Sequence, residues 1–201
     1  MPEETDVRRA LLEAAARLLG EEGPSALSTR RLAREAGTST MAVYTHFGGM
    51  PALVREIVAD GFARLFDRVA AVTPSDDVVD DLLRVAAAYR ANALEHPHVY
   101  AVMFGSASLG GYRLRDDELD VGLAAFGQLV DVTRRAMAAG ALREDDPAAV
   151  AGQLWSALHG YVMLELSGFN AVVDDPERQL LWPMLGHLVE GLSVQGHRPD
   201  R

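Results

Sequence analysis

The chain has 201 residues, of which 49% are apolar and 24% are charged, a balance typical of a folded globular protein rather than of a disordered one. It contains no cysteine, which excludes disulfide bonds and thiolate metal sites. Its formal charge of -10 argues against a surface that binds nucleic acid over most of its area, because phosphate binding depends on Lys and Arg.

The N-terminus and the apolar runs predict a cytoplasmic protein without a membrane partner. The first residues lack the basic start and the apolar run of a signal peptide. No apolar stretch approaches the ~18 residues that indicate a membrane span.

Helix start and stop signals recur along the chain, whereas alternating strand patterns with hairpin turns are missing. We therefore predict an all-α fold of about nine helices. The first is expected over residues 5–22, where a Gly-Pro pair stops it. Ser28 caps the second helix, and Gly37 makes the turn into a third helix that ends at Phe47.

A larger helical part follows. A long fourth helix is expected over residues 51–72, and Ser75 is expected to cap the fifth. Two later helix starts share one signal, an Asp cap followed by Pro at the first helical position. These starts are Asp146-Pro147 and Asp175-Pro176, and they open helices expected over residues 147–168 and 176–194. Two other helices are expected before them, at about residues 98–104 and 116–139. The predicted domains are residues 1–48 and residues 49–201.

The segment from Ser28 to Leu53 is the one that suggests a specific partner. Four arginines and two acids lie between residues 24 and 59, whereas the acidic runs lie mostly after residue 60. Hydroxyl groups can contact bases or phosphates, a Met can contact a thymine methyl, and an Arg can form a forked pair with guanine. The apolar residues of the segment are assigned to a small core. The side chains expected on the exposed surface are Arg30, Ser39, Thr40, Met41, Tyr44, Thr45 and His46.

The same segment resembles the head of the tetracycline-repressor (TetR/AcrR) family of bacterial transcriptional regulators. The resemblance rests on Thr29-Arg30-Arg31-Leu32-Ala33, Ala36-Gly37 and Val43-Tyr44-Thr45-His46-Phe47. It implies that Thr29, Tyr44 and His46 hold DNA phosphates. It also implies that the bases are faced by Arg30, Ser39, Thr40 and Met41. The chain departs from the family at Thr38, where an apolar residue is usual, and at Met50, where a phosphate-binding Lys is usual.

Two helices of the C-terminal part carry stripes that suggest a homodimer. In one helix, small residues recur every four positions at Gly152, Ser156 and Gly160. In the last helix, an apolar stripe has helical spacing. It consists of Leu181, Met184, Leu185, Leu188 and Leu192. The family resemblance implies that these helices pair with their copies, although a core within one chain would produce a similar stripe.

Aromatic and flexible apolar residues of the C-terminal part predict a site for a small apolar or aromatic effector. These residues are Tyr89, Tyr100, Met103, Phe104, Phe126, Trp155, His159 and Met163. Each could instead belong to the core, and His159 could be a structural histidine. Trp155, His159 and Gly160 resemble the Trp…His-Gly signature of one C-terminal subgroup of the family.

No pattern typical of catalysis, metal binding or a bound cofactor stands out, so we expect a protein that is not an enzyme and needs no cofactor or metal. The leading hypothesis is a dimeric DNA-binding transcriptional regulator. In this hypothesis it represses from a palindromic double-stranded operator and is released by a small molecule. The alternative is a helical sensor of small molecules with weak or no sequence-specific DNA binding.

Overall fold

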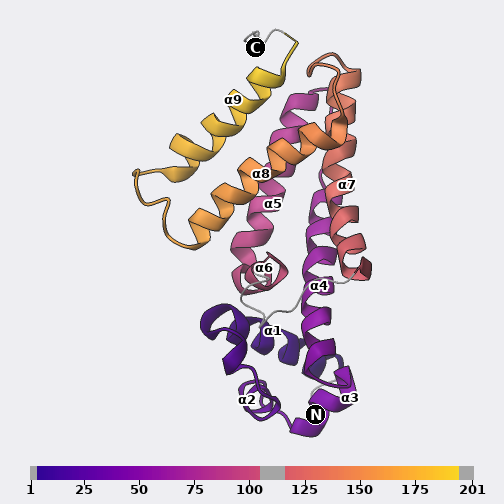
Figure 1. Cartoon of the computed structure of the whole chain (residues 1–201), viewed down its shortest axis with the longest axis vertical. Coiled ribbons are helices and arrows are strands. Elements are labelled where there is room, and N and C mark those ends of the chain that lie inside the picture. The colour runs from indigo at the N-terminus through magenta and orange to yellow at the C-terminus, as the bar shows by residue number, and fades with distance from the viewer. Residues whose placement is uncertain (1–3, 105–115, 195–201) are drawn as a thin grey trace. The chain divides into compact units, whose positions relative to one another are not determined.

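The computed structural model describes residues 4–104 and 116–194, and within them the predicted all-α class is confirmed. The helices are shown in Figure 1. In chain order they are α1 (Glu4–Glu22), α2 (Thr29–Glu35), α3 (Thr40–Phe47), α4 (Met50–Ala70), α5 (Val78–Glu95), α6 (Pro97–Phe104), α7 (Asp116–Ala138), α8 (Pro147–Leu166) and α9 (Trp182–Leu192). A 3-10 turn lies at Pro24–Ala26, and a π-helical turn at Glu177–Leu181 leads into α9. None of the helices in these ranges is both long enough and apolar enough to cross a membrane.

The chain forms two compact units, and the long helices α4 and α7 each contribute to both. The first unit contains α1, α2, α3, α4 up to Leu65, α6 and α7 up to Leu123. The second contains the end of α4, then α5, the larger part of α7, α8 and α9. The sequence predicts a DNA-binding helix-turn-helix domain in residues 1–48 and a ligand-binding and dimerisation domain in residues 49–201, and both assignments stay predictions.

A small core organises the start of the first unit. Leu32 and Ala33 of α2 are buried together with Val43 and Phe47 of α3, as the sequence predicts. Leu11 of α1 is fully buried as well. Short helices such as α2 and α3 are marginal alone, so burial of these side chains is what stabilises them.

Helix α6 packs closely against α1 and α4 within the first unit, and a glycine lies at each contact. A Cβ atom added to Gly20 of α1 would lie 3.0 Å from the Cβ of His98 and 3.1 Å from its Cα. A Cβ atom added to Gly61 of α4 would lie 2.5 Å from the sulfur of Met103 and 2.8 Å from a methyl of Val99. The two glycines therefore let α6 approach both helices more closely than any other residue would allow.

Replacing Gly20 with alanine should therefore destabilise the protein relative to a matched change in an open position. Alanine is favoured over glycine in a helix by about 1 kcal/mol, but overpacking against the His98 backbone costs about 1–3 kcal/mol. Gly127 of α7 provides the control, because an added Cβ there meets nothing within 4 Å. Chemical denaturation should show Gly127→Ala to be more stable than Gly20→Ala. Equal stability of the two variants would contradict the close contact.

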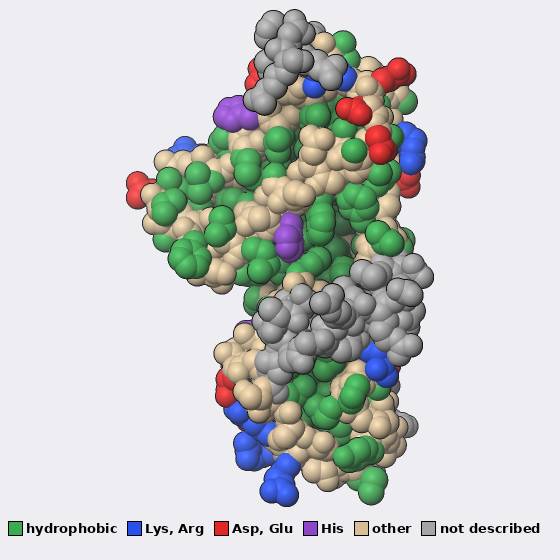
Figure 2. Space-filling model, viewed as in Figure 1, with side chains coloured by type: hydrophobic (Ala, Val, Ile, Leu, Met, Phe, Trp, Pro, Cys, Tyr) green, Lys and Arg blue, Asp and Glu red, His purple; other side chains and the backbone are tan. Residues whose placement is uncertain are grey.

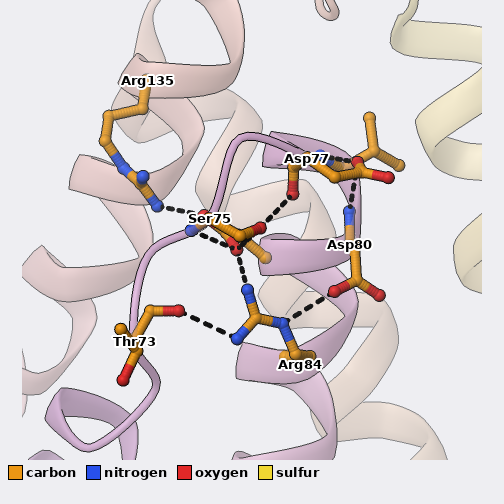
Figure 3. A network of polar contacts seen from close by, with 8 residues as sticks. Thr73, Ser75, Asp77, Asp80, Arg84 and Arg135 are labelled. Atoms are coloured by element: carbon orange, nitrogen blue, oxygen red, sulfur yellow. Dashed lines mark hydrogen bonds and ion pairs between the residues drawn. The ribbon is translucent and has the colours of Figure 1, made fainter.

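The connection between α4 and α5 is held by a buried carboxylate, and Figure 3 shows the polar network of this region, with Ser75, Arg84 and Arg135 labelled. Asp81 is 1% exposed and accepts hydrogen bonds from the N–H of Ser75 at 3.0 Å, from its hydroxyl at 2.8 Å and from Arg135 of α7 at 2.7 Å. Arg84 also pairs with Asp81 and donates to the carbonyl of Thr73 at 2.9 Å. The Ser75 backbone bond, the Ser75 hydroxyl and Arg135 hold the pKa of the Asp81 carboxyl well below its usual range.

The predicted cap at Ser75 is wrong. Helix α5 begins at Val78, and Asp77 caps it by accepting hydrogen bonds from the N–H groups of Val79 at 3.1 Å and Asp80 at 3.0 Å. Ser75 lies outside the helix because its polar groups are directed to Asp81. In contrast, the predicted Asp146 cap is confirmed, since its carboxylate accepts from the N–H of Ala148 at 3.0 Å.

Candidate functional site

Helices α2 and α3 form a tight helix-turn-helix pair whose ends are set by local hydrogen bonds. The Ser28 hydroxyl accepts from the N–H of Arg31 at 3.3 Å and begins α2, as predicted. Gly37 has a φ of 64°, a left-handed conformation that glycine adopts without strain, and it turns the chain into α3. The Ser39 hydroxyl caps α3 by accepting from the N–H of Ala42 at 3.2 Å. Ser39 was predicted to face bases, and the same hydroxyl has a structural role as the cap of α3.

One face of α3 is exposed and carries side chains that the sequence assigned to DNA. Met41 is 69% exposed and Tyr44 is 56% exposed, although both are large. Thr40 is exposed on the same turn, and Thr45 lies beside Tyr44. Both side chains are therefore accessible to a partner that contacts this face of α3.

The other predicted DNA contacts are less exposed. His46 is half-buried, with its ring centroid 6.1 Å from that of Phe47. Thr29 is the half-buried first residue of α2. The roles given to these residues and to the exposed face of α3 stay predictions.

Most arginines of residues 1–48 form ion pairs with acidic side chains. Arg31 forms a forked pair with Glu22 at 2.5 and 2.9 Å, and Arg17 donates to Glu35 at 2.8 Å. Arg8 pairs with Glu56, and its guanidinium also lies 5.5 Å from the ring centroid of Phe47. Sequence alone could not show these pairings, because the partners are distant along the chain.

Arg30 differs from these arginines. It is exposed and takes part in none of the ion pairs found within the described ranges. Figure 2 shows arginine side chains gathered over α2 on the visible face. A guanidinium without an acid partner can form a forked pair with a guanine edge or a phosphate without first breaking an ion pair.

In the second unit, the structure brings together four of the predicted effector residues. The indole N–H of Trp155 donates to the Tyr89 hydroxyl oxygen at 3.2 Å, and that hydroxyl is hydrogen-bonded to Nδ1 of His159 at 3.0 Å. The Trp155 ring lies 5.3 Å from the His159 ring and 6.1 Å from the Phe126 ring, centroid to centroid. We call Tyr89, Phe126, Trp155 and His159 the aromatic cluster.

The aromatic cluster contains no charged side chain. Burial lowers the pKa of the His159 imidazole, so the ring is neutral at pH 7 and can accept the Tyr89 proton at Nδ1. The cluster therefore presents neutral hydrogen-bonding groups among aromatic rings, as sites for small organic molecules commonly do.

The remaining predicted effector residues do not join the aromatic cluster. Tyr100 and Met103 are buried in the first unit, and the Tyr100 ring lies 4.7 Å from that of Phe104. Met163 belongs to the second unit but is 37% exposed. The eight predicted residues are thus divided between the two units.

A small apolar pocket in the second unit was not predicted. Its volume is about 30 Å³, and the side chains that line it are all aliphatic. They are Leu82, Leu83 and Ala86 of α5, Leu129 of α7, Leu154 and Leu158 of α8, and Leu185 and Val189 of α9. Sequence reasoning missed the pocket because leucines at helical spacing look the same whether they fill a core or border a gap in it.

The stripes assigned to a dimer separate into two groups. Leu181 and Leu185 are 0% and 3% exposed, so these two side chains belong to the core of their own chain. Met184, Leu188 and Leu192 are half-buried. On α8, a Cβ atom added to Gly152 or Gly160 would meet nothing within 4 Å, and Ser156 is exposed. The small-residue stripe of α8 therefore faces open space.

A partly buried ion-pair network fixes α8 and the start of α9 to α5. Arg90 of α5 donates to both oxygens of Glu165 at 2.8 and 2.7 Å and to Glu177 at 2.7 Å. The Trp182 indole N–H donates to Glu177 at 3.1 Å. Forked Arg–carboxylate pairs are geometrically specific, so this network holds α8 and α9 in a defined arrangement.

Protonation of His159 should destabilise the protein in mild acid. The imidazole pKa is lower in the folded protein than in the unfolded chain, where it is about 6.5, so the unfolded chain binds the proton more readily. The stabilisation is complete above about pH 6.5 and is lost as the pH falls toward the folded-state pKa. We expect thermal melts between pH 7.5 and 5.5 to show a falling midpoint that His159→Gln flattens. His187→Gln, the same substitution at an exposed position, is the matched control.

Comparison with known proteins gives two family matches. The family described as "Bacterial regulatory proteins, tetR family" matches residues 11–57, and the one described as "Tetracyclin repressor-like, C-terminal domain" matches residues 82–186. The first match covers the helix-turn-helix pair, and the second covers most of the second unit, including the aromatic cluster and every residue that lines the apolar pocket except Val189.

Individual proteins agree with these matches. An uncharacterized HTH-type transcriptional regulator of Mycobacterium tuberculosis is 33% identical over 171 residues, which are 84% of this chain and 72% of that protein. An HTH-type transcriptional regulator of Mycobacterium bovis is 27% identical over 146 residues, which are 71% of this chain and 62% of that protein. The solved structure of a Rhodococcus protein of unknown function superposes with a TM-score of 0.77 at 27% identity, over 93% of this chain and 95% of that one.

Proposed function

The chain belongs to the TetR family of DNA-binding bacterial transcriptional regulators, and from that membership we propose that it is a homodimeric repressor released from its operator by a small molecule. In this proposal residues 1–48 bind DNA, and residues 49–201 dimerise and bind the effector. The family is one of regulators rather than enzymes. The observation that carries the proposal is the exposed face of α3 at Met41 and Tyr44, together with the exposed Arg30 of α2, which has no acid partner in the described ranges.

DNA reading is proposed to divide between bases and phosphates. Arg30, Thr40 and Met41 lie at exposed positions from which they can contact base edges in a major groove. Tyr44, Thr29 and His46 are proposed to hold phosphates, which fixes the position of α3. A symmetric dimer places two such helices one helical turn of DNA apart, about 34–36 Å, so the operator is expected to be near-palindromic.

The Arg30 contribution can be separated from the phosphate contacts by mutation. Arg30→Ala should relax the base preference at one operator position in each half-site by about 1–3 kcal/mol. Tyr44→Phe should weaken binding to all sequences alike, since a phosphate contact carries no sequence information. The measurement is an affinity series against operators with single base changes. A uniform loss for Arg30→Ala would show that Arg30 contacts only phosphate.

Dimerisation is proposed to use α8 and α9. The open small-residue stripe at Gly152, Ser156 and Gly160 would let a second helix approach closely, while Met184, Leu188 and Leu192 supply partly exposed apolar contacts. A symmetric interface uses the same surface on both copies, so the stripe of each subunit would contact the partner at the same interface. The Arg90 network supports this arrangement because it keeps the two helices in register within each chain.

Control by an effector requires that the ligand distinguish two states of the protein. Moving a population from 1:99 to 99:1 requires a preference of about 10⁴-fold for the released state. The aromatic cluster of the second unit is the proposed effector site, because its polar groups are neutral and its rings supply apolar surface. Residues of α5, α7 and α8 meet there, so a ligand could change how these helices pack.

A further inference from the structure

The apolar pocket between α5, α7, α8 and α9 has a definite chemical character. Eight aliphatic side chains line a volume of about 30 Å³. Such a pocket gives water no hydrogen-bond partner, so it favours an apolar occupant. An aromatic ring needs much more room, since a cavity that binds benzene measures about 150 Å³. The pocket therefore matches a short alkyl group.

Helical spacing places the pocket beside the aromatic cluster. Leu154 and Leu158 line the pocket, and the residues that follow each of them, Trp155 and His159, belong to the cluster. Residues four apart lie on one face of a helix, so α8 carries an aliphatic stripe next to a polar one. On α5, Ala86 lines the pocket and Tyr89 of the cluster is three residues away.

Two sets of charged side chains in this unit are already paired among themselves. Arg90 is paired with Glu165 and Glu177, and Asp81 is bound by Arg84 and Arg135. A charged ligand at the cluster would lose hydration without meeting an opposite charge, which is costly. A neutral hydrogen-bonding group avoids this cost, because Tyr89 and His159 are themselves neutral partners.

We propose that the second unit selects neutral effectors that carry a short aliphatic group, with this group in the apolar pocket and a hydroxyl or carbonyl beside Tyr89 and His159. This inference rests on the proposed ligand control and adds the class of ligand. It also connects the effector to α9, because Leu185 and Val189 form part of the pocket wall. Filling the pocket would press on the helices proposed to form the dimer.

The test uses a homologous series of straight-chain primary alcohols, from ethanol to pentanol, with butanoate as the charged comparison. The chain has two tryptophans, so Trp182→Phe leaves Trp155 as a single fluorescent reporter at the cluster. Each added methylene should tighten binding roughly fourfold until the pocket is full. Butanoate should bind at least about tenfold more weakly than butanol, because its charge is not compensated.

Two variants of the lining should move the preferred chain length in opposite directions. Ala86→Val adds volume to the lining and should shorten the preferred alcohol, whereas Leu158→Val removes a methylene and should lengthen it. These shifts also exclude general partitioning of alcohols onto the protein, which would be the same in all three proteins. The proposal is overturned if affinity is independent of chain length or if both variants keep the wild-type preference.

Failure of this proposal is distinguishable from failure of the proposed function. Operator binding by the ligand-free protein is measured on the same samples and does not depend on the pocket. A protein that binds its operator but shows no chain-length preference would lack this ligand class and would still be a repressor. Loss of operator binding in the ligand-free wild-type protein would instead count against the proposed function.

Discussion

Replacing both Gly152 and Gly160 with leucine should convert the proposed dimer into a folded monomer. Neither position is crowded within its own chain, because an added Cβ meets nothing within 4 Å at either glycine. In a dimer built on this stripe, four inserted side chains would meet the partner helices, at about 1–3 kcal/mol each. The dimer dissociation constant should therefore increase by roughly 1,000-fold or more. Sedimentation or light scattering over a range of concentrations measures the change.

The matched control for this experiment is Gly127→Leu on α7, which is also open within the chain and is not part of the stripe. It should remain dimeric. The double variant should keep its helical circular dichroism spectrum and lose at least about 100-fold in operator affinity, since each head would then bind alone. A double variant that stays dimeric would show that the subunits meet elsewhere.

Asp81→Asn should strongly destabilise the second unit, because Asp81 is a buried carboxylate with several partners. The substitution keeps the shape but removes the charge that faces Arg84 and Arg135, and the amide cannot accept all the bonds from Ser75. Breaking one partner of a buried ion pair is strongly destabilising, and we expect the thermal midpoint to fall by about 5–10 °C. Asp80→Asn is the control, because Asp80 also pairs with Arg84 but is 55% exposed, and it should change the midpoint by less than about 2 °C.

Asp81 also predicts how the protein responds to acid. Its folded-state pKa is below the unfolded value of about 3.9, so its stabilisation is present above that value and is lost as the pH falls through the folded pKa. Asp81→Asn should therefore be less sensitive to acid than the wild type below about pH 4. Identical acid unfolding curves for the two proteins would show that the carboxylate is not held as described.

Local signals in the sequence predicted much of the first unit. Ser28 and Asp146 cap helices as expected, and Gly37 makes the turn, because each acts on backbone groups within a few residues. Leu32 and Phe47 are buried as predicted because short amphipathic helices leave few other ways to form a core. The exposed face of α3 follows from the same pattern.

Features that depend on distant residues were not predictable in this way. Asp77 replaces Ser75 as a cap because Ser75 is engaged by Asp81, and Arg31 is neutralised by Glu22 across a turn between helices. The inclusion of α6 in the first unit depends on close packing at Gly20 and Gly61, which no local pattern indicates. The aromatic cluster was partly predicted, because its residue types are unusual, whereas the aliphatic pocket has no distinctive residue type.

Selection of bound duplexes from a random-sequence DNA pool by the full-length chain tests the central claim most directly. We expect enrichment of a near-palindrome with half-sites one helical turn apart, bound at least about 10³-fold more tightly than random duplex at physiological salt. Its affinity should fall as the salt concentration rises, as phosphate contacts require. Failure to enrich any sequence, with equal and weak binding to all duplexes at low salt, would contradict the account and leave a helical small-molecule sensor in its place.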